Sequence, residues 1–510
     1  MNVSNPLFNW LDHRASGVLL HPTSLPGDGG IGTFSDAAIA FLDHLRDGGF
    51  RYWQICPLGP TGYGDSPYQS FSSFAGNPYL IDLGPLVEGH LLHDHELQSL
   101  RELPHDRVDY GGLYQRKWPL LDLAYQRWRD HGRNWQPYGS FDRFSTEHQS
   151  WLEDFTLFQA LKSKYDGKPW WEWPDQAKKI ASARKKETGE ETVRRREAQA
   201  FYQYLFFGQW KKIRQAAKER NIQIIGDLPI FVSRDSADAW SQPDLFQMDP
   251  KTLHPVKVAG CPPDYFSETG QFWGNPVYDW EGNRSALMAW WTERLRLNFL
   301  LADVIRIDHF RGLESYWSIP ADAPDATHGE WVPGPGIDFF KPLAKAFPEG
   351  RIIAEDLGLI TDEVRTLLAE TGLPGMAVLQ FAFGDDADNF YLPHNLVPNQ
   401  VIYTGTHDND TSLGWYLNVH DKARDHLRRY LRVDGSEVGW DLIRTALSSV
   451  ARLAIIPLQD LLSLDSSARF NTPGKAEGNW QWRFRGNQLQ QLRGGTLGYL
   501  YSQNALYGRL

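Results

Sequence analysis

The chain has 510 residues and a formal net charge of -11 at pH 7, and 41% of its residues are hydrophobic. This length is sufficient for a large core, including an α/β barrel with insertions. The acidic balance argues against a nucleic-acid partner, because nucleic-acid-binding domains present a basic field. Two cysteines, Cys56 and Cys261, are too few for a disulfide scaffold. They fit a reducing compartment, so we expect a cytoplasmic protein.

No apolar run approaches the ~18 residues of a membrane helix. Residues 1–17 contain neither a basic nor an apolar region of the kind found in a signal peptide. We therefore expect no membrane partner. The aromatic content is high, with 21 Trp, 21 Tyr and 27 Phe. Aromatic rings offer flat apolar faces that suit the C–H faces of sugars, although most of these rings must fill the core.

Segments with strand character alternate with helical patterns along the chain. Eight such segments are found, at residues 17–25, 52–58, 222–231, 304–308, 351–358, 376–381, 400–408 and 453–460. Most are followed by a helical pattern, such as residues 35–45 after the first. This alternation predicts a (β/α)₈ TIM barrel that forms one catalytic domain over residues 1–510. We expect a loop and helical insertion at about 59–221, a loop-rich insertion at about 232–300, and no separate C-terminal β domain.

A glycine-rich loop follows the first predicted strand. Gly27, Gly29 and Gly32 match the dinucleotide-binding pattern G-x-G-x-x-G literally. However, Pro26 separates the strand from the glycines, and the next strand has no acidic residue at its end to bind a ribose hydroxyl. We interpret the segment as a flexible loop and predict no cofactor.

The fourth predicted strand carries an unusual pair of charges. Arg306 and Asp308 are two residues apart, so in a strand they share one face. A cation beside a carboxylate keeps it ionised, which is what a carboxylate nucleophile requires. A structural ion pair at the end of a strand is the alternative interpretation of these residues alone.

Carboxylates end four of the predicted strands: Asp227, Asp308, Glu355 and Asp408. The C-terminal ends of the strands form the active face of such a barrel, so these acids should converge. Mutual repulsion should hold one of them protonated, and a retaining glycosidase needs such an acid beside a nucleophile. A Mg²⁺ or Mn²⁺ site that includes His309 and His407 is the competing possibility. Because Arg306 opposes a cation there, we predict no metal.

The segment Val304–Gly312 resembles the fourth-strand signature of the 4-α-glucanotransferases of glycoside hydrolase family 77. These enzymes are also called amylomaltases or disproportionating enzymes, and they are relatives of the α-amylase superfamily. The resemblance extends over essentially the whole chain. It includes Ser24–Pro26, Gly30–Gly32, Pro60–Tyr68, Gly226–Pro229 and Thr406–Asn409.

The resemblance implies a role for each matching residue. It implies that Asp308 is the nucleophile, Glu355 the general acid/base and Asp408 the acid that favours the distorted sugar ring. Arg306 would orient and ionise Asp308. The implied substrate-binding residues are Tyr63, Asp65, Asp227, Asp264, Gln271, Trp273, His309 and His407.

The resemblance also implies an activity, namely transfer of part of a 1,4-α-glucan to the 4-hydroxyl of an acceptor by retaining double displacement. The expected donors are maltooligosaccharides, amylose or other α-1,4-glucans, and the expected acceptors are glucose or maltooligosaccharides. Two alternatives remain open at this point. One is an amylase-type α-glucan hydrolase, and the other is a non-catalytic glucan-binding barrel.

Overall fold

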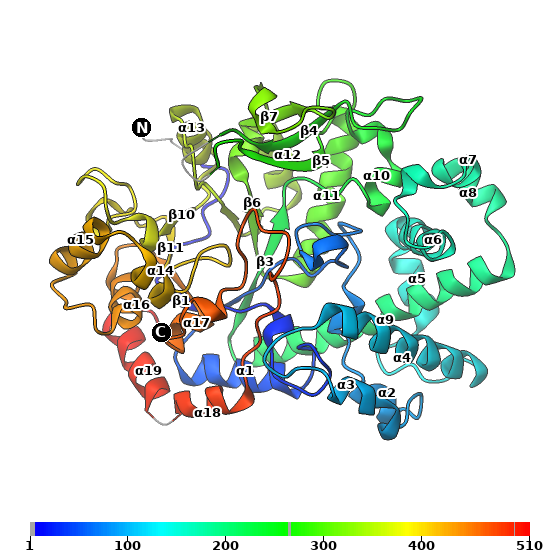
Figure 1. The fold of residues 1–510 in the computed structure, drawn as a ribbon, viewed down its shortest axis with the longest axis horizontal. Helices are drawn as coiled ribbons and strands as arrows, with labels where there is room; N and C mark the ends of the chain where they lie inside the picture. The colour runs from blue at the N-terminus through cyan, green and yellow to red at the C-terminus, as the bar shows by residue number, and fades with distance from the viewer. Residues whose placement is uncertain (1–5, 264–266, 494) are drawn as a thin grey trace.

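The computed structural model describes residues 6–263, 267–493 and 495–510. Its centre is a sheet of eight parallel strands, which curls into a barrel (Figure 1). The strands are β1 (Ala15–Leu19), β2 (Tyr52–Gln54), β3 (Gln223–Pro229), β6 (Val304–Asp308), β9 (Ile352–Ala354), β10 (Gly375–Val378), β11 (Gln400–Tyr403) and β12 (Leu453–Pro457). Their order is β10-β11-β12-β1-β2-β3-β6-β9. The ends of the sheet meet where the N–H of Ala354 donates to the carbonyl of Pro374, 3.0 Å away. The predicted (β/α)₈ barrel is confirmed.

The alternation predicted for the fourth strand of the barrel, β6, is present in the structure. Ile305 and Ile307 pack outward, in a cluster with apolar residues of the surrounding helices. Val304 belongs instead to the cluster inside the barrel, with Ile225 and Ile353 of the neighbouring strands. Because residues two apart in a strand share a face, Arg306 and Asp308 lie on the inner side with Val304. The register pairs Asp227 of β3 with Arg306, and this pairing brings the two side chains together.

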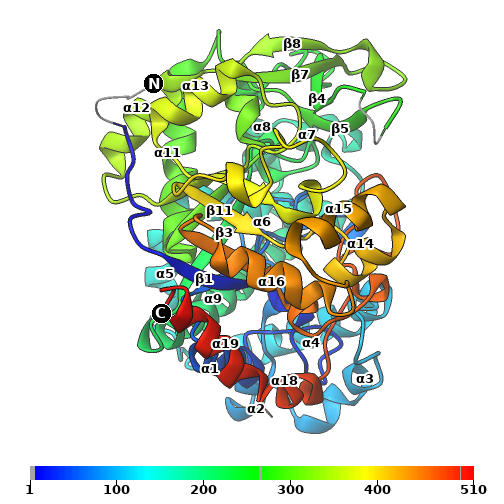
Figure 2. The ribbon, with the colours of Figure 1, turned by 90° about the vertical axis from the view of Figure 1, so that its left-hand side faces the viewer.

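Helices surround the barrel (Figures 1 and 2). Those between or after the barrel strands are α1 (Asp36–Asp47), α11 (Arg284–Leu301), α12 (Ile337–Ala346), α13 (Asp362–Thr371), α14 (Ser412–Asn418), α15 (Asp421–Leu431), α16 (Val438–Ser448), α17 (Leu458–Leu461), α18 (Gly486–Arg493) and α19 (Thr496–Leu506). Helix α1 matches the prediction for residues 35–45. The described residues after β12 contain no strand.

Between β2 and β3 the chain forms a helical region, at the right and lower right of Figure 1. Its helices are α2 (Gly84–Glu88), α3 (Gln98–Arg101), α4 (Tyr110–Asp130), α5 (Phe141–Glu147), α6 (Gln149–Lys164), α7 (Asp175–Lys178), α8 (Ile180–Lys186) and α9 (Glu190–Glu219). The 30-residue α9 packs against α6 and α4 and leads directly into β3. Many aromatic residues of the chain lie in these contacts, including Trp128, which stacks on Phe201. These aromatic rings are therefore part of the hydrophobic core.

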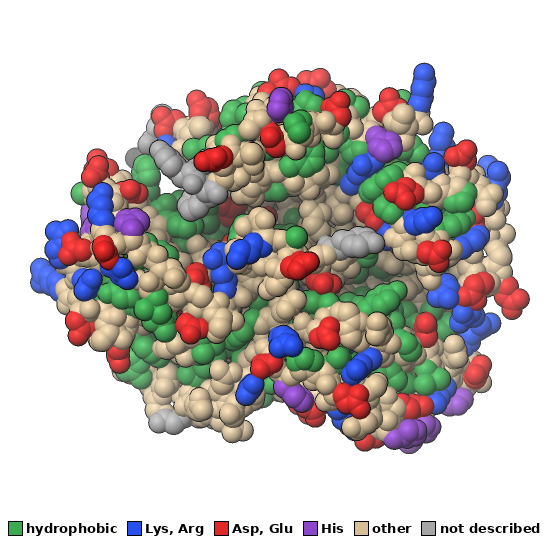
Figure 3. Space-filling view, in the orientation of Figure 1, with side chains coloured by type: hydrophobic (Ala, Val, Ile, Leu, Met, Phe, Trp, Pro, Cys, Tyr) green, Lys and Arg blue, Asp and Glu red, His purple; other side chains and the backbone are tan. Residues whose placement is uncertain are grey.

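A second sheet, which was not predicted from the sequence, lies at the top of Figure 2. It is antiparallel, with the order β5-β4-β7-β8. Its strands are β4 (Lys257–Cys261), β5 (Gln271–Pro276), β7 (Ser315–Pro320) and β8 (Glu330–Pro333). The helix α10 (Ala237–Ser241) precedes it. The sheet combines segments inserted after β3 and after β6, so the acids at the ends of these two strands lie beneath it. Figure 3, which has the orientation of Figure 1, shows a recess in the surface below this sheet.

Seven of the eight predicted strands end earlier in the structure than expected, and only β6 ends at the predicted residue, Asp308. The differences are largest at β1 and β11. β1 ends at Leu19, and a 3-10 turn over Pro22–Ser24 follows it. β11 ends at Tyr403, so His407 and Asp408 lie in the turn after the strand. In the described part of the chain, no helix combines the length and the apolar character that crossing a membrane requires.

Candidate active site

Arg306 is the centre of a network of carboxylates at the mouth of the barrel. Its Nη1 donates to both carboxylate oxygens of Asp227, at 2.8 and 2.7 Å. Its Nη2 lies 3.0 Å from Oδ1 of Asp308. Burial lowers the pKa of Arg306, but the charges of Asp227 and Asp308 raise it well above its ordinary value. The guanidinium therefore stays charged and fixes two carboxylates at once.

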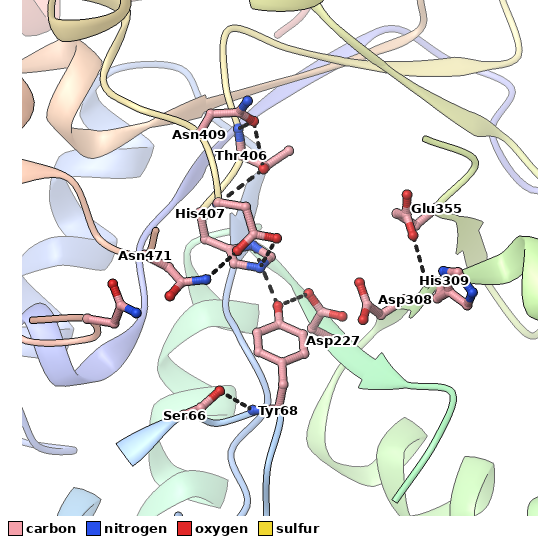
Figure 4. Close-up of polar contacts among 12 residues, drawn as sticks. Ser66, Tyr68, Asp227, Asp308, His309, Glu355, Thr406, His407, Asn409 and Asn471 are labelled. Carbon is pink, nitrogen blue, oxygen red and sulfur yellow. Dashed lines mark hydrogen bonds and ion pairs between the residues drawn. The ribbon is translucent and has the colours of Figure 1, made fainter. Parts of the chain in front are cut away.

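Asp308 is the most accessible member of this network. Its side chain is 29% exposed, whereas those of Arg306 and Asp227 are 4% and 1% exposed. Figure 4 shows Asp308 between Asp227 and Glu355. One oxygen of Asp308 is held by Arg306, and the carboxylate remains open to the recess. This is the arrangement of an oriented nucleophile.

Glu355 follows β9 and is buried. Its Oε2 accepts a hydrogen bond from the N–H of His309 at 2.6 Å, and its Oε1 accepts one from the N–H of Leu357 at 2.8 Å. Burial, together with the negative charge of Asp308, raises the pKa of Glu355 to about 7. At neutral pH this carboxyl therefore exists partly as the acid, the form that a general acid needs.

His309 connects Glu355 to the four-stranded sheet. Its backbone is left-handed, with φ 56° and ψ 46°, a conformation that costs a non-glycine residue of order 1 kcal/mol. Its ring meets Trp273 edge to face at 4.9 Å, and the Nε1–H of Trp273 donates to the Oε1 of Gln271 at 3.0 Å. Burial lowers the pKa of His309 to about 4, so the ring is neutral. Its Nε2 has no hydrogen-bond partner among the described residues. A ligand in the recess is a suitable partner for it.

Asp408 lies on the opposite side of the mouth, with a side chain that is 45% exposed. Its Oδ1 accepts from the Nδ2–H of Asn471 at 2.6 Å, and its Oδ2 lies 3.3 Å from Nε2 of His407. Burial of part of the residue raises its pKa, but His407 and Asn471 outweigh this effect and lower the pKa to about 2. Asp408 is thus a permanent anion.

Tyr68 joins the two sides of the site. Its hydroxyl donates to Oδ2 of Asp227 at 2.8 Å and lies 3.5 Å from Nδ1 of His407. Its ring stacks on the His407 ring, with centroids 5.0 Å apart and planes at 14°. Burial lowers the pKa of His407, but the charge of Asp408 reverses this and raises it overall. One continuous chain of contacts therefore runs from Asp408 through His407, Tyr68 and Asp227 to Arg306. Figure 4 shows its middle part, in which Tyr68 joins His407 and Asp227.

Most of the site residues predicted from the sequence lie in this set of contacts. It unites Arg306, Asp227, Asp308, Glu355, His309, Trp273, Gln271, His407 and Asp408. Asp65, in the turn Tyr63–Asp65, makes no hydrogen bond or ion pair with the other described members, and burial raises its pKa to about 6. Asp264 and the side chain of Tyr63 lie outside the described residues.

Sequence reasoning did not select four residues that contact this set: Tyr68, Arg469, Asn471 and Trp480. Tyr68 ends the motif Pro60–Tyr68, which was singled out but offered no reason to prefer this tyrosine. Arg469 and Asn471 lie in a loop that precedes α18. Their contact with Asp408 spans more than 60 positions of sequence, so no local pattern reveals it.

No group of three or more His, Cys, Asp or Glu side chains in the described ranges is arranged to hold a metal ion. The centre of the acids is instead filled by the Arg306 guanidinium, which makes the ion pairs given above. The charge of the carboxylates is therefore compensated by the protein itself.

Comparison with known proteins gives one consistent result. The family model described as 4-alpha-glucanotransferase matches residues 20–490. The chain is 46% identical to a 4-alpha-glucanotransferase of Thermus thermophilus over 95% of its length and 97% of that protein. It is 47% identical to one of Streptococcus pneumoniae, over 93% and 94% of the two chains.

Solved structures agree with these matches. The amylomaltase of Streptococcus agalactiae in complex with acarbose superimposes with a TM-score of 0.92 at 36% identity, covering 97% of this chain and 99% of that one. The amylomaltase of Corynebacterium glutamicum, at 18% identity and a TM-score of 0.75, shares the fold. The chain therefore belongs to the 4-alpha-glucanotransferases, glycoside hydrolase family 77.

Proposed function

We propose that this protein is a 4-α-glucanotransferase that moves part of a 1,4-α-D-glucan to the 4-hydroxyl of an acceptor sugar. The observation that carries this proposal is the pairing of Asp308 and Glu355. The Asp308 carboxylate is held by Arg306, and the neighbouring Glu355 has a pKa raised to about 7. A retaining reaction needs a carboxylate nucleophile beside a carboxyl group that can donate a proton.

In the first step, the Asp308 carboxylate attacks the anomeric carbon of the donor. The glycosidic C–O bond breaks, and the leaving oxygen takes the proton of Glu355. The product is a β-glucosyl ester on Asp308. In the second step, the ionised Glu355 takes the proton of the acceptor hydroxyl as that oxygen attacks the same carbon. The ester bond breaks, and two inversions restore the α configuration.

The remaining polar groups bind the sugar. The anionic Asp408 and the neutral His309 suit hydrogen bonds to sugar hydroxyls, and the ring of Trp273 offers an apolar face. The relative from Streptococcus agalactiae was solved with acarbose, which supports a glucan-binding role for the recess. We propose maltooligosaccharides or amylose as donors, and glucose or maltooligosaccharides as acceptors. A cytoplasmic location belongs to the same proposal.

Transfer and hydrolysis share the covalent ester and differ only in what attacks it. The recess lies beneath the second sheet, and Trp273 of β5 contacts His309 directly beside Glu355. A wall of this kind lowers the access of water and raises the effective concentration of a bound acceptor. This favours transfer over the hydrolase alternative, and the paired acids favour an enzyme over a non-catalytic binding protein.

The test is incubation of the pure protein with maltotriose alone, with the products resolved by chain length. We expect glucose and a ladder of longer oligosaccharides at a constant total of reducing ends. If only glucose and maltose form while reducing ends increase, water resolves the ester and the protein is a hydrolase. If no turnover occurs while maltotriose still binds, the protein is a glucan-binding barrel.

A further inference from the structure

A small cavity adjoins the turn that contains Asp408. Apolar side chains, such as Phe470, form much of its wall, and its polar lining residues include His21, His407, Gln459 and Arg469. The space open to a water molecule is about 20 Å³. One buried water requires about 10–15 Å³ measured in this way, together with two to four polar partners. The cavity is large enough for a single water molecule, and its lining includes polar side chains that can bind one.

His21 is the lining residue with an unsatisfied buried atom. It follows β1 and is 6% exposed, and its Nδ1 is buried without a hydrogen-bond partner among the described residues. Burial lowers the pKa of His21 to about 3, so the ring is neutral and each nitrogen either donates or accepts. Buried polar atoms in folded proteins almost always have a partner, either protein or ordered water. A water in this cavity supplies one.

The same cavity adjoins the segment that holds Asp408. Arg469, which lines it, donates from Nη2 to the main-chain carbonyl of Asp408 at 2.7 Å. Its Nε donates to the carbonyl of Asn471 at 2.8 Å, and Asn471 binds the Asp408 carboxylate. Phe470 lies between Arg469 and Asn471 in the sequence, and the centroid of its ring is 6.3 Å from that of the His21 ring. Arg469 and Asn471 therefore bind Asp408 at its main-chain carbonyl and at its carboxylate, and His21 lies near Phe470 between them.

We propose that His21 and Arg469 together hold one water molecule in this cavity, and that the water fixes residues 469–471 against Asp408. His21 is then a positioning residue for the reaction, because it acts on Asp408 through the water and Arg469 and does not itself touch the sugar. The inference rests on the role in glucan transfer proposed above for Asp408. It goes further by naming His21 and a bound water molecule as the groups that hold Asp408 in position for that role.

The alternative is that His21 only fills space in the core. Two substitutions of nearly equal size separate these possibilities. His21→Asn keeps a polar atom close to the position of Nδ1, whereas His21→Leu removes it. A residue that only packs tolerates both changes similarly, but a residue that binds the water tolerates only the first.

A matched control is available in His44 of α1, a second buried histidine. Its Nδ1 lies 2.6 Å from the carbonyl of Ala40, and its Nε2 lies 3.2 Å from that of Leu489. These partners are main-chain atoms of α1 and α18, and none of them belongs to the site. His44→Leu should lower the melting temperature and leave kcat unchanged.

The experiment measures kcat and KM of wild type and the three variants on maltotriose, well below their melting temperatures. Displacing a catalytic group by about 1 Å costs up to about 100-fold in rate, so we expect His21→Leu to lose about 10-fold in kcat with KM changed less than about 2-fold. His21→Asn should keep kcat within about 3-fold of wild type. Equal kcat values for His21→Leu and His21→Asn would overturn the inference.

A high-resolution crystal structure of the wild type provides a second measurement, which does not depend on activity. We expect one ordered water in the cavity, within hydrogen-bond distance of Nδ1 of His21 and of Arg469, and no such water in His21→Leu. A dry wild-type cavity would also overturn the inference. Failure of the proposed transferase function is seen separately, in the products that the wild type forms from maltotriose.

Discussion

Glu355 and Asp408 occupy equivalent places in the barrel, each just after the end of a strand, yet the protein treats them in opposite ways. Glu355 is buried beside Asp308, and its hydrogen-bond donors among the described residues are two backbone N–H groups. Asp408 is half exposed and has His407 and Asn471 as close partners. The pKa of Glu355 is raised to about 7, and that of Asp408 is lowered to about 2.

The difference shows how one ring of strand ends provides both an acid and an anion. Backbone N–H groups stabilise a carboxylate, but at Glu355 they do not outweigh burial and the charge of Asp308. At Asp408 burial also raises the pKa, but the electrostatic interaction and hydrogen bond with His407 and the hydrogen bond from Asn471 outweigh it. The predictions below test this contrast, in order of expected effect.

Replacement of Asp308 by Asn should have the largest effect. Without the nucleophile the covalent ester cannot form, and we expect kcat to decrease by about 10⁴-fold or more. Binding of acarbose or maltooligosaccharides, measured by calorimetry, should persist, because the other sugar contacts remain. Turnover at a substantial fraction of the wild-type rate would remove Asp308 from the nucleophile role.

Replacement of Glu355 by Gln should lower kcat on unactivated glucans by about 10²–10⁴-fold, the usual contribution of general acid catalysis. The loss should be much smaller on an α-maltosyl fluoride, whose leaving group needs no proton. In the wild type, kcat/KM should decrease as the pH rises through about 7, where Glu355 loses its proton. The variant should lack this limb of the profile. Equal losses on both substrates would argue against the acid role.

Replacement of Asn471 by Ala tests the Asp408 side with a smaller change. The carboxylate of Asp408 loses a 2.6 Å hydrogen bond, although His407 remains. We expect kcat/KM to decrease by about 10-fold, a loss typical of one hydrogen bond to a charged group. Asn479→Ala is the control, since the hydrogen bonds of the Asn479 side chain to the described residues go to main-chain atoms of Thr472 and Lys475 in the same loop. Similar losses in the two variants would mean that the loop matters and the contact with Asp408 does not.

The carboxyls of Glu355 and Asp408 should also change the unfolding free energy in opposite directions as the pH rises. The raised pKa of Glu355 stabilises the fold below about pH 4.5, and this contribution is lost as the pH rises through about 7. The advantage of Glu355→Gln over wild type in unfolding free energy should thus grow by about 1–3 kcal/mol between pH 5 and pH 8. The lowered pKa of Asp408 stabilises at neutral pH and is lost towards pH 2, so Asp408→Asn should destabilise at pH 8. Thermal melts of both variants across this range provide the measurement, and shifts of the same sign would contradict the contrast.

The sequence predicted the barrel because its evidence is local. Apolar segments such as Val401–Tyr403 and Leu453–Pro457 are bounded by helical patterns, and periodicity identifies them. It also placed Arg306 and Asp308 on one face, since alternation in a strand needs no tertiary information. The second sheet was missed because its central strand β4 pairs with β7, which begins more than 50 residues after β4 ends.

The sequence by itself determined the residue types at the strand ends and, through the family motifs, the chemistry they serve. Only the tertiary structure decided which carboxyl has the raised pKa. That choice depends on the burial of Glu355, on the reach of Arg306 to two carboxylates, and on the contact of Asn471 with Asp408. Each of these joins segments far apart in the chain. The pKa of a carboxyl depends on the solvent and charges around it, and these exist only once the chain has folded.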